Sequence, residues 1–146
     1  MPHTKEFFDV PEKLVTQRVN SSRQLLVAYD NQQNYFLDTT NVSSYSTWDG
    51  KTPLKYVCGL LNSKLINFWY CKKYLMPTIG GYELHSIPVK TINNYDTFIS
   101  LVDGAISAAQ NNNLIVLSKK MKEIDEIVYE IYGLTDAEIK IIEQSI

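Results

Sequence analysis

The sequence predicts an α+β domain: a small, twisted, mostly antiparallel sheet with a central helix pair, closed by C-terminal helices. Two observations lead to this prediction. The first half of the 146-residue chain contains short β-prone runs separated by turn residues, and the second half shows helical periodicity. We divide the domain into a strand-rich core with a central helical segment, residues 1–92, and a helical part, residues 93–146, that packs on it.

The strands are expected in four short runs of the first half. The runs occupy residues 13–19, 25–29, 35–39 and 42–48; the first is rich in β-formers, and the second and third are short and apolar. The polar link over residues 30–34 favours a hairpin with a long loop between the second and third runs.

The central helix pair is expected to begin at Thr52, which can cap the first turn, with Pro53 in the first helical position. Apolar residues then recur at helical spacing. Residues 61–64 break this pattern, so the sequence predicts two helices, with Asn62 or Ser63 capping the second.

A short apolar strand is expected over residues 84–89, and the chain then becomes helical. Residues 95–109 carry an amphipathic pattern, three asparagines break it, and a heptad-like seam runs over residues 114–131. We expect this seam to pack on the sheet or on the preceding helix. Gly133 should end that helix, and Thr135 should open the last one through a capping box with the glutamate three residues later.

Charge is unevenly distributed along the chain. Residues 51–90 carry six lysines and one acidic residue, whereas both flanking segments are acidic and the whole chain has a formal charge of −2. A basic, aromatic-rich segment is what a polyanion-binding surface needs. A helix whose lysines are only solvated would show the same composition, so both interpretations stay open.

The sequence shows no catalytic or metal-binding pattern. His3 and His85 are the only histidines, a glycine-rich phosphate loop is missing, and the acids of residues 123–143 resemble a solvated helix face. Cys58 and Cys71 are expected to be free and mostly buried. No apolar run is long enough to span a membrane and no signal sequence is visible, so we expect a cytoplasmic, non-catalytic chain.

Several runs are similar to those of a known family. They are KLVTQRV at 13–19, LLVAYD at 25–30, LLNSKLINFWY at 60–70, GYELHSIPV at 81–89 and IVYEIYGLTDAEI at 127–139. In this order they resemble the C-terminal specificity domains of TaqI-like restriction-modification enzymes, and also the target-recognition domains of type I specificity subunits. The most distinctive part is the Leu-Asn-Ser run of the third segment followed by the Ile-Pro pair of the fourth.

The resemblance implies sequence-specific recognition of double-stranded DNA for a restriction-modification enzyme. In that family the domain follows an N6-adenine methyltransferase domain, often with a nuclease domain too, and reads its target in the major groove. The methyltransferase motif, Asn or Asp followed by two prolines and an aromatic residue, is missing here, because the five prolines are never adjacent. Catalysis is therefore not transferred to this chain. The cofactors, S-adenosylmethionine and in some enzymes Mg²⁺, are expected in the parent enzyme.

We expect the DNA-contacting residues in the basic segment and in the strand region. Lysines and arginines would hold phosphates, and side chains near the Gly-Gly turn would reach phosphates or base edges. The candidates are Arg18, Arg23, Lys55, Lys64, Lys72, Lys73, Tyr82, His85 and Lys90.

Two other functions stay open from the sequence. The acidic C-terminal region and the heptad seam would suit a protein-interaction module that docks a partner subunit or the methyltransferase domain. Binding of RNA would need exposed aromatic rings for base stacking, whereas Phe68 and Trp69 are predicted to be buried. Lysines gathered on one face would favour DNA, and scattered lysines would favour the interaction module.

Overall fold

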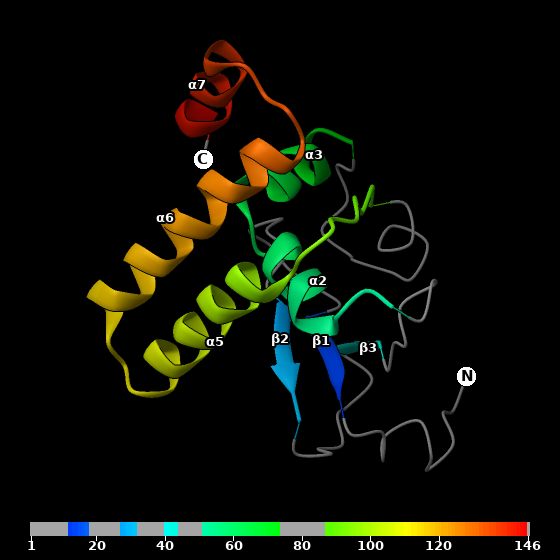
Figure 1. Ribbon diagram of the computed structural model, residues 1–146, viewed down its shortest axis with the longest axis vertical. Coiled ribbons are helices and arrows are strands. Elements are labelled where there is room, and N and C mark those ends of the chain that lie inside the picture. Colours follow the sequence, from blue (N-terminus) through cyan, green and yellow to red (C-terminus); the bar gives the residue numbers. More distant parts are fainter. Residues whose placement is uncertain (1–11, 18–26, 32–39, 44–50, 74–86, 146) are drawn as a thin grey trace.

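The computed structural model describes residues 12–17, 27–31, 40–43, 51–73 and 87–145. A small sheet lies below helix α2, a pair of long helices, α5 and α6, covers one side, and α7 lies at the opposite end from the sheet (Figure 1). This arrangement confirms the predicted α+β class with an antiparallel sheet, a central helix pair and C-terminal helices.

The sheet contains three described strands, β1 (Lys13–Gln17), β2 (Val27–Asp30) and β3 (Thr40–Ser43). β1 is the middle strand and pairs antiparallel with both neighbours. The predicted third run, residues 35–39, lies outside the described residues. Lys13 faces Asp30 across the β1–β2 ladder, and their side chains form an ion pair of 3.3 Å with exposed fractions of 0% and 7%. A shift in register between β1 and β2 would separate these buried charges and leave each without its partner. The pair therefore favours one register of the two strands.

The central helices are α2 (Leu54–Leu61) and α3 (Lys64–Lys73), so the predicted break between them is confirmed. Ser63 caps α3, because its hydroxyl oxygen accepts the backbone N–H of Ile66 at 3.4 Å. The predicted start of α2 is wrong by one residue: Pro53 precedes the helix in an extended conformation, and no side chain caps this end. The Pro53 carbonyl instead accepts the N–H groups of the first turn.

The C-terminal helices are α5 (Asp96–Gln110), α6 (Leu114–Ile131) and α7 (Asp136–Ser145). The asparagine break is confirmed: Asn112 has a φ of 54°, and the side chain of Asn113 accepts the N–H of Val116 at 3.2 Å. This turn folds α6 back along α5 (Figure 1). The apolar seam of α6 therefore packs on the preceding helix, which was one of the two arrangements predicted from the sequence. None of the described helices has the length and apolar character that crossing a membrane requires.

The join between α6 and α7 follows the sequence prediction. Gly133 has a φ of 65°, and the N–H of Leu134 reaches back to the carbonyl of Tyr129 at 3.1 Å, which closes the end of α6. Thr135 and Glu138 form the capping box, with bonds of 2.9 and 3.2 Å between each side chain and the other residue's N–H. These bonds lower the pKa of Glu138.

Helix α2 lies between two apolar clusters. One side packs with the sheet, α3 and Ile87, and the other packs with α5 and α6. At Gly59 the helices α2 and α5 approach so closely that an added Cβ would lie 2.4 Å from the ring of Phe98. Cys58 is buried and Cys71 half-buried, and neither forms a disulfide, as predicted. Helix α2 therefore joins the sheet and α3 to the α5–α6 pair.

Candidate nucleic-acid interface

The last turn of α3 carries two of the predicted DNA-contacting residues, Lys72 and Lys73, and both are exposed. Lys72 lies over the ring of Phe68 at 5.5 Å, and Lys73 lies over the ring of Trp69 at 4.9 Å. The negative end of the helix dipole favours cations at this position. We call these two lysines the basic end of α3. Both cations lie in the last turn of the same helix, and lysines exposed in this way can bind phosphates of the DNA backbone.

Lys55 and Lys64 have acidic partners from the C-terminal helices. Lys55 Nζ lies 2.7 Å from Asp103 of α5 and also lies over the ring of Tyr29 at 5.4 Å. Lys64 Nζ lies 2.7 Å from Glu143 of α7, and this hydrogen bond raises the pKa of Lys64. These two lysines therefore join the basic segment to the C-terminal helices, and their charges are largely neutralised within the domain.

Lys90 ends a segment whose backbone is fixed by two tyrosines. The hydroxyl of Tyr132 donates to the carbonyl of Pro88 at 2.6 Å and accepts the N–H of Lys90 at 3.1 Å, while the hydroxyl of Tyr56 donates to the carbonyl of Lys90. Burial raises the pKa of both tyrosines. The Lys90 side chain is exposed. The backbone of Lys90 is therefore held by tyrosines of α2 and of the end of α6 rather than by bonds within its own segment.

The predicted strand over residues 84–89 is wrong in its described part. Residues 87–89 form an irregular segment in which the N–H of Val89 bonds to the carbonyl of Ile87 at 3.0 Å. Pro88 has no N–H to offer a strand ladder, and the tyrosine hydroxyls occupy the neighbouring backbone groups.

The turn before α3 is bound to the sheet by Asn62. Its side-chain oxygen accepts the N–H of Val27 at 3.1 Å, and its amide nitrogen donates to the carbonyls of Val27 and Cys58, both at 2.9 Å. The amide thus pairs with an edge strand of the described sheet as another strand would. This is the asparagine of the Leu-Asn-Ser run, so the most distinctive run of the sequence orients α3.

The N-terminal end of α3 is held by acids that the sequence analysis did not select. Asp125 accepts the backbone N–H of Lys64 at 2.9 Å, and Glu143 accepts both Lys64 Nζ and the hydroxyl of Tyr129, the latter at 2.8 Å. The prediction that residues 123–143 form a solvated acidic face is wrong for Asp125, which is only 5% exposed. Its place beside Ile124 of the apolar seam is the sequence signal that could have indicated burial.

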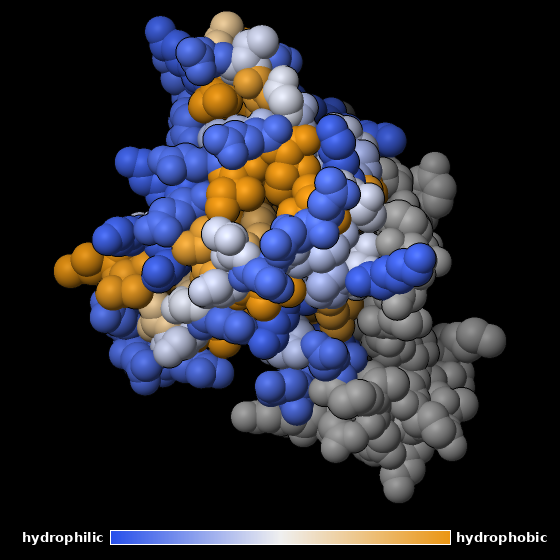
Figure 2. All heavy atoms as spheres, viewed as in Figure 1, coloured by the Kyte–Doolittle hydropathy of each residue, from blue (hydrophilic) through white to orange (hydrophobic). Residues whose placement is uncertain are grey.

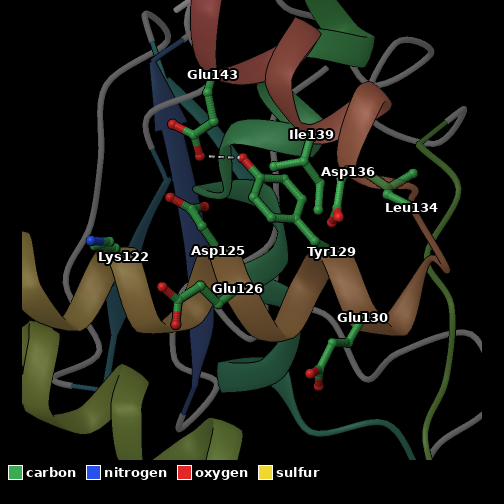
Figure 3. Close-up of a pocket in the computed structure, with 9 residues that line it drawn as sticks. All are labelled: Lys122, Asp125, Glu126, Tyr129, Glu130, Leu134, Asp136, Ile139 and Glu143. Carbon is green, nitrogen blue, oxygen red and sulfur yellow. Dashed lines mark hydrogen bonds between the residues drawn. The ribbon is translucent and has the colours of Figure 1, made fainter.

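The same acids line a pocket of about 430 Å³ between α6 and α7 (Figure 3). Burial raises the pKa of Asp125, whereas the hydrogen bonds from Lys64 and Tyr129 lower the pKa of Glu143. Five carboxylates and one lysine surround the pocket, so its potential opposes a polyanion. Across the described ranges, no group of three histidine, cysteine or acidic side chains could hold a metal ion.

Four candidates, Arg18, Arg23, Tyr82 and His85, lie outside the described residues and stay predictions. Phe68 and Trp69 are half-buried rather than buried, and each has a lysine over its ring. The rings are therefore not open platforms for stacked bases.

Residues 1–89 match the model of the TaqI-like C-terminal specificity domain. The resembling run at 127–139 lies beyond the matched residues. A search of curated proteins gave no match.

Proposed function

The chain belongs to the family of TaqI-like C-terminal specificity domains, and we propose a detailed function from this membership. The membership supports a role in DNA target recognition for restriction-modification. The chain recognises the target of an adenine-specific DNA methyltransferase. It binds double-stranded DNA and carries no catalytic step itself. S-adenosylmethionine, and Mg²⁺ where the parent enzyme also cleaves, act in the parent enzyme.

The basic end of α3 supports a phosphate-binding role within this function. Lys72 and Lys73 are exposed at the end of a helix whose other end is fixed to the sheet and to α6. Lysines placed in this way hold the DNA backbone and set the register of the base-reading residues. Lys90 is a further exposed cation, whereas Lys55 and Lys64 contribute less because acids already bind them.

Salt-dependent DNA binding tests this proposal. Replacing Lys72 and Lys73 together by alanine should weaken binding to all duplexes to a similar extent. Each lost phosphate contact should reduce the slope of log K against log salt concentration by about one. The control replaces Lys119 and Lys120 of α6 by alanine, which removes the same charge from the acidic region. Equal losses of affinity in both double variants would exclude the basic end of α3 as the DNA-binding surface.

A second function, docking of a partner through the C-terminal helices, is favoured by an exposed apolar tip. We define the α6 tip as Leu114, Ile115 and Val116, of which the first two are 72% and 85% exposed. Figure 2 shows this apolar area protruding at the left, over the N-terminal end of α6. Apolar side chains gathered in this way are costly in water and typical of a protein contact.

The methyltransferase domain of the parent enzyme is the partner we propose for the α6 tip. Replacing Leu114 and Ile115 by serine should abolish association with that domain and leave DNA binding of the chain unchanged. Ile141→Ser, on the exposed face of α7, is the control for loss of an exposed aliphatic side chain. Unchanged association after the double replacement would contradict this proposal.

A further inference from the structure

Two carboxylates of the C-terminal helices meet at the start of α3. Asp125 of α6 accepts the Lys64 N–H at 2.9 Å, and Glu143 of α7 accepts Lys64 Nζ at 2.7 Å. Figure 3 shows Asp125, Glu143 and Tyr129 lying together between α6 and α7, with the bond from the tyrosine to Glu143. One residue of α3 is thus bound at its backbone and at its side-chain end.

The chemistry of this contact suits a fixed end of a helix. The first N–H groups of a helix have no partner within the helix, and a carboxylate is favoured there by the helix dipole. Asp125 is almost fully buried, so it cannot exchange this N–H for water without cost. Tyr129 and Lys64 together leave Glu143 few alternative orientations.

We propose that Asp125 and Glu143 are positioning residues for DNA recognition: by fixing the start of α3 they set the place of its basic end. This inference rests on the proposed function. A helix of 10 residues is roughly 15 Å long, so a tilt of about 10° about its start moves the far end by about 2.5 Å. That displacement approaches the length of a hydrogen bond, and is enough to break a lysine–phosphate contact. Both acids lie beyond residues 1–89, so the family-matched part depends on the helices that follow it.

The sign of the effect separates positioning from simple electrostatics. Removing a carboxylate from a DNA-binding protein normally strengthens binding, because one repulsive charge is lost. Loss of Glu143 would also release Lys64 for phosphate binding. Positioning predicts the opposite: Glu143→Ala should weaken binding at least fivefold, although the variant is less negative. Glu130→Ala, at an exposed glutamate of α6 in the same pocket, is the control with the same change of charge.

The variants at Asp125 supply a test by rescue. Asp125→Ala removes the acceptor of the Lys64 N–H, whereas Asp125→Asn keeps a carbonyl oxygen in the same place. Both variants lose the same negative charge. We expect Asp125→Ala to lose affinity and target preference, and Asp125→Asn to retain most of both. Equal behaviour of the two variants would contradict the role of the hydrogen bond.

The experiment uses the full chain and a pool of duplexes with a randomised centre. The duplex that the wild-type chain enriches, and a scrambled version of it, are then titrated with each variant at low salt by fluorescence anisotropy. We expect Glu143→Ala to lower the ratio of the two affinities, with Glu130→Ala unchanged within about twofold. If Glu143→Ala does not fold, as judged by circular dichroism, Glu143→Met against Glu130→Met gives the same comparison, because methionine has a similar length but no oxygen to accept from Lys64 or Tyr129.

The outcomes separate this inference from the proposed function. If the wild-type chain enriches no duplex, the proposed function is overturned and the inference falls with it. If the chain enriches a duplex but the Glu143 variant binds it as tightly as its Glu130 control, the inference alone is overturned.

Discussion

Replacement of Asn62 tests whether this residue joins the helix pair to the sheet or reads DNA. An asparagine in a recognition domain could bind adenine through its amide, so the family resemblance alone leaves both roles open. In the structure the amide already makes three bonds, two to Val27 and one to Cys58, of 2.9 to 3.1 Å. Each such bond contributes about 0.5–1.5 kcal/mol net. Because water can reach the partly buried site, we expect Asn62→Ala to lower the free energy of unfolding by about 2–3 kcal/mol.

Asn62→Asp sharpens the test because it preserves shape. The carboxylate can still accept the Val27 N–H, but it places a second oxygen against two carbonyl oxygens. This repulsion raises the pKa of the new carboxyl in the folded state above its unfolded value. The variant should therefore show its whole loss of stability at pH values above the folded-state pKa. The loss should shrink as the pH falls through the folded value towards about 4, since a protonated carboxyl can donate again.

Urea denaturation followed by circular dichroism measures these changes. Asn93→Ala, at an exposed asparagine, is the control and should change stability by less than about 0.5 kcal/mol. Folded Asn62 variants should keep the target preference of the wild-type chain. If both variants are as stable as the wild type while the preference at one base pair relaxes, Asn62 reads DNA and the structural assignment is wrong.

Three further predictions concern stability and accessibility. Gly59→Ala should destabilise the domain by about 1–3 kcal/mol, because its Cβ would overlap the aromatic ring of α5. Gly104→Ala should instead be neutral or stabilising by up to about 1 kcal/mol, since only a flexible lysine stem lies near it; equal thermal shifts would contradict the close approach. Burial raises the pKa of Cys58 to about 12, so at pH 8 iodoacetamide should modify Cys71 first, and mass spectrometry showing equal rates would refute the burial. Thr135→Ala should cost about 0.5–2 kcal/mol through the lost capping box, and an unchanged urea midpoint would show that the cap is dispensable.

The sequence by itself determined the features whose causes are local. The break between α2 and α3, the asparagine turn before α6, the end of α6 at Gly133 and the capping box each depend on residues within a few positions of one another. Backbone conformation and the bonds of helix ends act at this range, so a pattern of residue types suffices to predict them. The start of α2 was misplaced by one residue, because Pro53 fits either side of a helix boundary.

Only the tertiary structure decided which charges of the basic segment are neutralised. Composition assigns six lysines to residues 51–90, but the partner of Lys64 lies 79 residues away on α7 and that of Lys55 on α5. Asn62 and Val27 are likewise 35 residues apart. Such pairs leave no periodic pattern in the sequence, because they form where elements that are distant in the chain pack against each other. The segment at residues 87–90 has both kinds of cause: Pro88 is a local signal against a strand, whereas the tyrosine hydroxyls that bond to the carbonyls of Pro88 and Lys90 come from residues more than 30 positions away.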